Sequence, residues 1–196
     1  MSSAWNRLDG GSARLFVALG VTPARELLAR AQGLVCERYR GAVPTGERDW
    51  HVTLLFIGAV AARAVPGLVE TLAQVAAQSR PFPIGFGRLG AFPSARRPRL
   101  VYLAPNRVGP EAARLHRRLA AAVTALELVP DARPRFEPHV TLARLTRPGP
   151  PLSPWEADGP RWQVESFALV ETVSFHGPSR YVERQAFPLQ DRDLIK

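Results

Sequence analysis

The chain has a single cysteine and no long hydrophobic run. Because Cys36 is the only cysteine among 196 residues, the chain forms no internal disulfide and has no pair of thiolates for a zinc site. No apolar run approaches the roughly 18 residues that a membrane span requires. The first residues also lack the basic-then-apolar order of a signal peptide. We therefore expect a cytoplasmic protein with no membrane association and no disulfide framework.

Lysine is nearly absent, whereas arginine is abundant. Lys196 is the only lysine, so 25 of the 26 basic residues are arginine, and the formal net charge is +9. Arginine binds phosphate and carboxylate groups through its planar fork. The excess favours a polyanionic partner such as RNA. The alternative is coding bias, because the charge is spread along the chain.

The composition is 46% hydrophobic and 22% charged, which excludes a disordered chain. We expect a flexible tail over residues 1–12 and a single domain over 13–196. The chain has no glycine-rich loop between a strand and a helix, and its predicted elements do not alternate regularly, so an α+β fold with mainly antiparallel strands is favoured over a Rossmann-type sheet. The predicted strands are 14–19, 50–57, 82–89, 99–104, 139–145, 163–175 and 181–188, and the predicted helices are 23–37, one that begins at residue 66, and 110–128.

A tetrapeptide, His-Val-Thr-Leu, occurs twice, at residues 51–54 and 139–142. Two such matches arise by chance with a probability on the order of 10⁻⁴. Both copies begin a predicted strand directly after a loop, which indicates an internal duplication. Side chains at positions i and i+2 of a strand point to the same face. Each copy, called here the first and the second HVTL motif, therefore presents one imidazole and one hydroxyl together.

Two histidines and two threonines in one cleft are suited to phosphodiester hydrolysis. One of His51 and His139 can accept a proton from the nucleophile while the other donates one to the leaving oxygen. The hydroxyls of Thr53 and Thr141 can donate hydrogen bonds to phosphate oxygens. One alternative is that the histidines are structural strand residues. A two-histidine metal site is another, but it lacks nearby third ligands, so we expect no metal and no cofactor.

Aromatic and basic side chains outside the motifs are further candidates for substrate binding. Tyr181, Tyr102 and Phe92 could stack on a base or pack in the core. Arg144 is out of phase with His139 and would need a β-bulge to face the cleft; otherwise it is a surface charge.

The other two histidines and the densest basic segment have ordinary structural explanations. The arginines at 96, 97 and 99 could guide an RNA backbone or lie in a solvated loop. His116 is expected at the boundary of a helix face, and His176 in a solvated turn.

The sequence resembles the 2H phosphoesterase superfamily, named for two His-x-Thr/Ser-x motifs, and within it the RNA 2′,3′-cyclic phosphodiesterases, or 2′-5′ RNA ligase-like proteins. The resemblance covers about residues 13–190. It rests on the two HVTL motifs and on the flanking segments 14–19, 55–58, 92–93, 98–99, 136–144 and 167–189. The resemblance implies a bilobal α+β fold with two antiparallel sheets around a cleft.

The same resemblance implies metal-independent hydrolysis of RNA 2′,3′-cyclic phosphate ends to 2′-phosphomonoesters. It implies that His51 is the proton donor and His139 the proton acceptor, that Thr53 and Thr141 hold the phosphate, and that Arg144 contacts substrate. The family often has tryptophan where this chain has Tyr102. Alternatives are 2′-5′ RNA ligation, hydrolysis of small cyclic nucleotides, or RNA binding without turnover. No obligate protein partner is expected.

Overall fold

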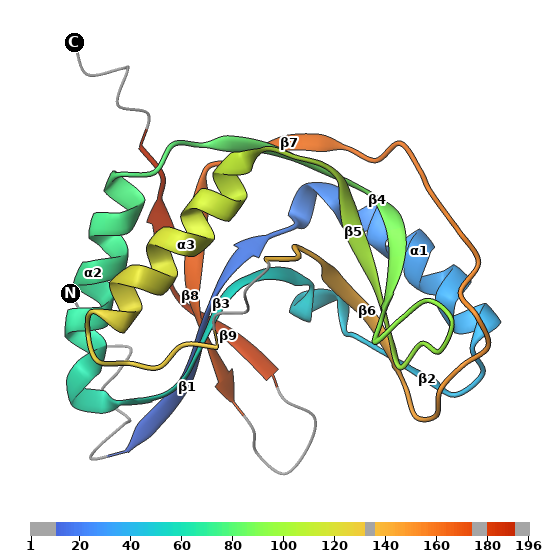
Figure 1. Ribbon diagram of the computed structural model, residues 1–196, viewed down its shortest axis with the longest axis horizontal. Coiled ribbons are helices and arrows are strands. Elements are labelled where there is room, and N and C mark those ends of the chain that lie inside the picture. Colours follow the sequence, from blue (N-terminus) through green and yellow to red (C-terminus); the bar gives the residue numbers. More distant parts are fainter. Residues whose placement is uncertain (1–10, 132–135, 174–179, 191–196) are drawn as a thin grey trace.

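The computed structural model describes residues 11–131, 136–173 and 180–190. Within these ranges the chain forms three α-helices and nine strands (Figure 1). The helices are α1 (Arg25–Arg38), α2 (Val65–Ala77) and α3 (Pro110–Thr124). The strands are β1 (Ser12–Gly20), β2 (Ala42–Pro44), β3 (His51–Ala61), β4 (Phe82–Phe92), β5 (Leu100–Val108), β6 (Val140–Leu145), β7 (Arg161–Val164), β8 (Ser166–Val173) and β9 (Arg180–Pro188).

The strands form two sheets, and every pair of neighbouring strands is antiparallel. One sheet has the order β3-β1-β8-β9 and the other the order β2-β6-β5-β4-β7. In Figure 1 the first sheet lies on the left and the second on the right. The predicted α+β class with antiparallel sheets is therefore confirmed. The first HVTL motif lies in the first sheet, and the second lies at the start of β6 in the other.

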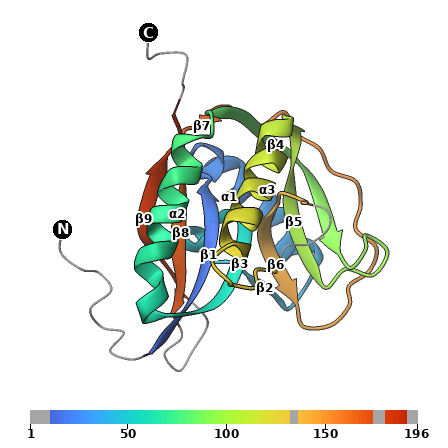
Figure 2. The same cartoon turned by 60° about the vertical axis from the view of Figure 1, so that its left-hand side comes forward.

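Two helices cover the four-stranded sheet and one covers the five-stranded sheet. Helices α2 and α3 lie side by side over the four-stranded sheet, and α1 packs against β6, β2 and β5 of the other (Figure 2). Helix α1 precedes the first motif in the chain but contacts the strand of the second, whereas α3 precedes the second motif but contacts β3 of the first. One cluster of buried apolar side chains includes residues from both sheets. Each motif therefore depends on a helix from elsewhere in the chain.

Several predicted boundaries were wrong. Helix α3 ends at Thr124 rather than 128, β2 lies in a segment expected to be loop, and the strand expected over 163–175 is two strands, β7 and β8. The strand expected to close at Gly58 continues to Ala61, because Gly58 adopts a φ of 87° that its missing Cβ permits.

Most of the expected tail and one of the four histidines lie outside the described residues. Strand β1 begins at Ser12, directly after the first described residue, and residues 1–10 of the expected tail lie outside the described residues. His176 also lies outside them. Among the described residues, no helix is long and apolar enough to cross a membrane.

Candidate active site

One cavity of about 290 Å³ is lined by residues of both HVTL motifs. The motifs reach it from different sheets, so the site forms only where the two sheets meet. Its polar lining includes His51, Thr53, His139, Thr141, Arg144 and Tyr181. The structure therefore brings together both predicted histidines and both predicted threonines in a single cavity.

Each motif is followed by the same local irregularity in its strand. In the pairing of β1 with β3, Val17 lies opposite Leu55 and Ala18 lies opposite Thr53, which leaves Leu54 as an extra residue. In the pairing of β5 with β6, Leu142 is left over in the same way. Such an extra residue is a β-bulge, and it resets the alternation of side chains along the strand. The last residue of each tetrapeptide is thus the bulged one.

The bulges decide which later side chains face the cavity. Without a bulge, Arg144 would point away from the face that holds His139, because five residues separate them. The bulge at Leu142 returns Arg144 to the cavity, where it is exposed and lines the wall. The corresponding residue after the first motif is Phe56, which is 46% exposed and also lines the cavity. The two halves of the site therefore differ at this position, with a cation in one and an aromatic ring in the other.

A side chain from the helix packed on each strand binds the carbonyl of each bulged leucine. His116 of α3 donates from Nδ1 to the carbonyl oxygen of Leu54 at 2.7 Å. Gln32 of α1 donates from Nε2 to the carbonyl oxygen of Leu142 at 2.8 Å, which also accepts a bond from the backbone N–H of Thr45. Bulging removes these carbonyls from the regular ladder, so they need such partners when buried.

His116 is buried in the site, so the prediction that it lies at the boundary of a helix face was wrong. It is 8% exposed, lines the cavity, and stacks on the ring of Phe136 with centroids 4.8 Å apart. The signal that could have found it is its spacing. It falls four residues after Ala112 and three before Leu119, which are both buried on the inner face of α3.

Both catalytic candidates have the same ring orientation. Nδ1 of His51 lies 2.7 Å from the carbonyl oxygen of Asp49, and Nδ1 of His139 lies 2.7 Å from that of Glu137. A carbonyl oxygen only accepts, so Nδ1 carries the proton in both rings and Nε2 is left for proton transfer. Nε2 of His51 lies 3.1 Å from Oγ1 of Thr53, and in the neutral ring it accepts from that hydroxyl.

Each imidazole is packed between one phenylalanine and one tyrosine from other strands of its own sheet. His51 contacts Phe16 and Tyr181 with centroid distances of 4.9 and 5.0 Å. His139 contacts Phe92 and Tyr102 at 5.2 and 5.0 Å. Each phenylalanine and its tyrosine also touch each other. These rings restrict the motion of the imidazoles and exclude water from their faces.

Tyr181 and Tyr102, which were predicted to bind substrate, each pack against one of the two motif histidines. Tyr181 meets His51 edge-on and lines the cavity, whereas Tyr102 packs on His139 without lining it. The ring of Tyr102 reaches this position over Gly90 of β4, where a Cβ atom would overlap it. Whether either ring also stacks on a base stays a prediction.

The electrostatic setting of the first histidine favours its neutral form. Burial lowers the pKa of His51 below 6.5, and the positive charge of His139 lowers it further, while the carbonyl and the carboxylate of Asp49 oppose the shift. Burial also raises the pKa of Tyr102, and the charge of Glu137 adds to this effect while Arg88 opposes it. Tyr102 is therefore an uncharged phenol near neutral pH.

The sequence did not identify several lining residues, because alternation within the motifs does not specify the direction of side chains in the flanking loops or beyond a bulge. Thr45, Asp49, Phe56, Asp131 and Phe136 line the cavity together with the predicted residues. Across the described ranges, no group of three or more histidine, cysteine, aspartate or glutamate side chains could hold a metal ion.

Known proteins share this sequence pattern and this fold. Residues 21–174 match the 2′-5′ RNA ligase superfamily. The chain is 31% identical over 144 residues to a Bacillus subtilis (strain 168) protein named RNA 2′,3′-cyclic phosphodiesterase, with 72% of this chain and 77% of the relative covered. It is 32% identical over 165 residues to a protein of the same name from Thermus thermophilus, with 81% of each chain covered.

A solved structure agrees with the sequence comparisons. A crystal structure of a Thermus thermophilus protein superposes with a TM-score of 0.79 at 30% identity, covering 91% of this chain and 99% of that one. The similarity therefore extends over both sheets and both motifs.

Proposed function

The chain belongs to the 2′-5′ RNA ligase superfamily, and on that premise we propose that it hydrolyses RNA 2′,3′-cyclic phosphate ends to 2′-phosphomonoesters. The observation that supports this most directly is the pairing of two histidines in one cavity, each held through Nδ1 so that Nε2 is left for proton transfer. Relatives about 30% identical are named for this activity.

The proposed reaction is an acid–base displacement at phosphorus. Nε2 of His139 accepts a proton from water as the water oxygen bonds to phosphorus. The bond from phosphorus to the 3′ oxygen breaks, and Nε2–H of His51 donates the proton that this oxygen needs. The phosphate remains on the 2′ oxygen. Transfer of a proton back from His139 to His51 through solvent restores both rings.

The remaining polar residues of the cavity suit the charge that develops on the phosphate. The hydroxyls of Thr53 and Thr141 and the guanidinium of Arg144 can donate to its non-bridging oxygens. The anionic substrate also raises the pKa of a nearby histidine. Substrate binding therefore promotes protonation of His51, which burial disfavours in the free protein.

An RNA oligonucleotide that ends in a 2′,3′-cyclic phosphate tests the proposal. We expect a product with a 2′-phosphate, identified by phosphorus NMR, and unchanged activity after treatment with EDTA. His51→Ala and His139→Ala should each lower kcat by about 10²- to 10⁴-fold. Thr146→Ala is the control, because Thr146 is exposed and lies after β6.

Other outcomes would identify a different activity. Near-normal turnover in either histidine variant would contradict the two-histidine mechanism. A 3′-phosphate product would reverse the positions assigned to the leaving and retained oxygens. Formation of a 2′-5′ linkage from two RNA ends would indicate ligation as the principal reaction.

A further inference from the structure

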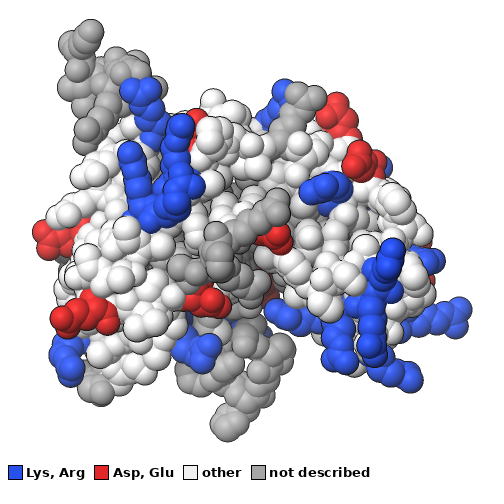
Figure 3. Space-filling view, viewed as in Figure 1, with Lys and Arg blue, Asp and Glu red and all other residues white. Residues whose placement is uncertain are grey.

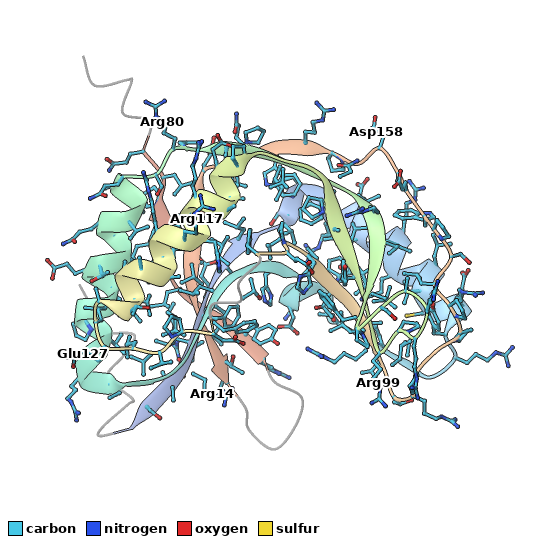
Figure 4. All side chains as sticks on the ribbon, in the orientation of Figure 1. Arg14, Arg80, Arg99, Arg117, Glu127 and Asp158 are labelled. Atoms are coloured by element: carbon cyan, nitrogen blue, oxygen red, sulfur yellow. The ribbon has the colours of Figure 1, made fainter. Side chains whose placement is uncertain are left out.

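Five exposed arginines gather at one end of the second sheet. They are Arg96, Arg97, Arg99, Arg144 and Arg147, and together they are called here the arginine patch. The first three lie in the loop between β4 and β5, and the last two lie at the end of β6 and just beyond it. Figure 3 shows basic side chains gathered at the lower right of the molecule, and Figure 4 labels Arg99 at this end of β4 and β5.

Backbone hydrogen bonds hold the two segments of the patch together. The backbone N–H of Leu145 donates to the carbonyl of Arg99 at 2.8 Å, and that of Gly149 donates to the carbonyl of Pro98 at 2.9 Å. A third bond, from Leu152 to Ala95, measures 2.8 Å. None of these bonds uses an arginine side chain. These bonds therefore fix the backbone that carries the arginines and do not involve the guanidinium groups.

The charge of the patch is uncompensated. Residues 89–110 and 138–155 contain no aspartate or glutamate. Within the described part of the chain, none of the five arginines takes part in an ion pair. Two arginines on α3 differ in this respect, because Arg114 pairs with Glu111 and Arg118 donates to the carbonyl of Gln78. The charge of the patch is thus available to a partner.

The patch is continuous with the catalytic cavity. Arg144 lines the cavity and is paired in the sheet with Leu100, which follows Arg99 directly. On the opposite side, the groove that continues from the cavity contains Asp131 together with Arg14. A polyanion that leaves the cavity is therefore attracted toward the patch more strongly than toward this groove.

We propose that the arginine patch binds the phosphodiester backbone on the 5′ side of the terminal cyclic phosphate. An RNA oligonucleotide, which reaches the patch, is then a better substrate than a mononucleotide, which occupies the cavity alone. This inference rests on the proposed function, because a terminal cyclic phosphate in the cavity leaves only the 5′ side of the strand to continue outward. Backbone contacts of this kind are independent of base sequence and sensitive to salt.

The test compares a patch variant with a control of equal charge. Arg96→Ala, Arg97→Ala and Arg99→Ala are combined, and the control combines Arg63→Ala, Arg114→Ala and Arg117→Ala, which are exposed residues outside the patch. For an RNA oligonucleotide with a 2′,3′-cyclic phosphate, kcat/KM of the patch variant should fall on the order of tenfold. The slope of log(kcat/KM) against the logarithm of salt concentration should become less negative by about 2. Hydrolysis of a mononucleoside 2′,3′-cyclic phosphate should be unchanged.

A binding measurement separates this inference from the proposed activity. Fluorescence anisotropy with an RNA that ends in a 2′-phosphate should show the same loss of affinity in the patch variant, whether or not the wild-type protein turns over substrate. Equal losses in the patch and control variants would overturn the inference, because they would reflect net charge alone. Equal losses for mononucleotide and oligonucleotide would overturn it as well. Absence of turnover with patch-dependent binding intact would contradict only the proposed activity.

Discussion

At the residue scale, the two HVTL motifs are identical in sequence but not in setting. Both histidines donate from Nδ1 to a carbonyl two residues earlier, which gives them the same tautomer. His51 is nevertheless held in its neutral form by burial and by the charge of His139. Five residues after each histidine, the chain has Phe56 in one copy and Arg144 in the other. Identical strand geometry therefore supports unequal chemical roles.

The lowered pKa of His51 predicts the shape of the pH–rate profile. If His51 is the proton donor, kcat/KM declines at high pH as the free protein loses this proton. The limbs of such a bell-shaped profile belong to the pair of histidines. Because burial lowers the pKa of His51 below 6.5, at least one limb of kcat/KM should lie below pH 6.5. The decline in kcat should occur at higher pH, because bound phosphate favours the protonated ring. Steady-state kinetics between about pH 5 and pH 9, at constant ionic strength, measures both limbs. A kcat/KM profile with both limbs above pH 6.5 would contradict the lowered pKa of His51.

At the element scale, the bulges couple each motif to a helix that lies elsewhere in the sequence. His116 of α3 satisfies the carbonyl of Leu54, and Gln32 of α1 satisfies that of Leu142. In both halves of the molecule, a helix side chain thus donates a hydrogen bond to the carbonyl of the bulged leucine. The internal duplication suggested by the repeated tetrapeptide stays a prediction, and this shared arrangement supports it.

Both helix side chains should contribute to stability. His116→Phe keeps a ring against Phe136 but removes the donor to the buried carbonyl of Leu54, so it should lower the free energy of unfolding by about 1–3 kcal/mol. Gln32→Met should also lower it, because it removes the donor to the carbonyls of both Thr45 and Leu142, although the carbonyl of Leu142 keeps its bond from the backbone N–H of Thr45. Urea denaturation followed by circular dichroism measures both. Unchanged stability in either variant would contradict the account of the bulges.

At the scale of the whole molecule, the cleft lies between two sheets that share one core. Leu19 and Leu54 of the first sheet belong to the same buried cluster as Leu103 and Leu142 of the second. The arginine patch extends from the second sheet, whereas the groove containing Asp131 adjoins the first. The distribution of charge around the cleft is therefore a property of the assembled molecule.

The shared core predicts that both sheets unfold in a single transition. Neither sheet can lose its packing without exposing apolar side chains of the other, so intermediates with one folded sheet should not accumulate. Differential scanning calorimetry should show one peak with a ratio of van't Hoff to calorimetric enthalpy of about 1. Two resolved peaks, or a ratio well below this value, would show that the sheets unfold independently.

Much of the candidate site could be predicted because it depends on local geometry. Alternation along a strand places His51 with Thr53 and His139 with Thr141 on common faces. Because the tetrapeptide occurs twice, chance is an implausible explanation of the two motifs. The antiparallel α+β class followed from the order of the predicted elements. The errors fell where local pattern is weakest, namely the end of α3 and the division between β7 and β8.

The sequence by itself determined which side chains share a face within each motif, since this depends on backbone geometry over three residues. Only the tertiary structure decided that the two faces meet in one cavity, because strands from different sheets must pack together for this to occur. It also decided the direction of Arg144, the burial of His116 and the lowered pKa of His51. These features depend on pairing register and on contacts between residues far apart in the chain, which alternation and spacing do not specify.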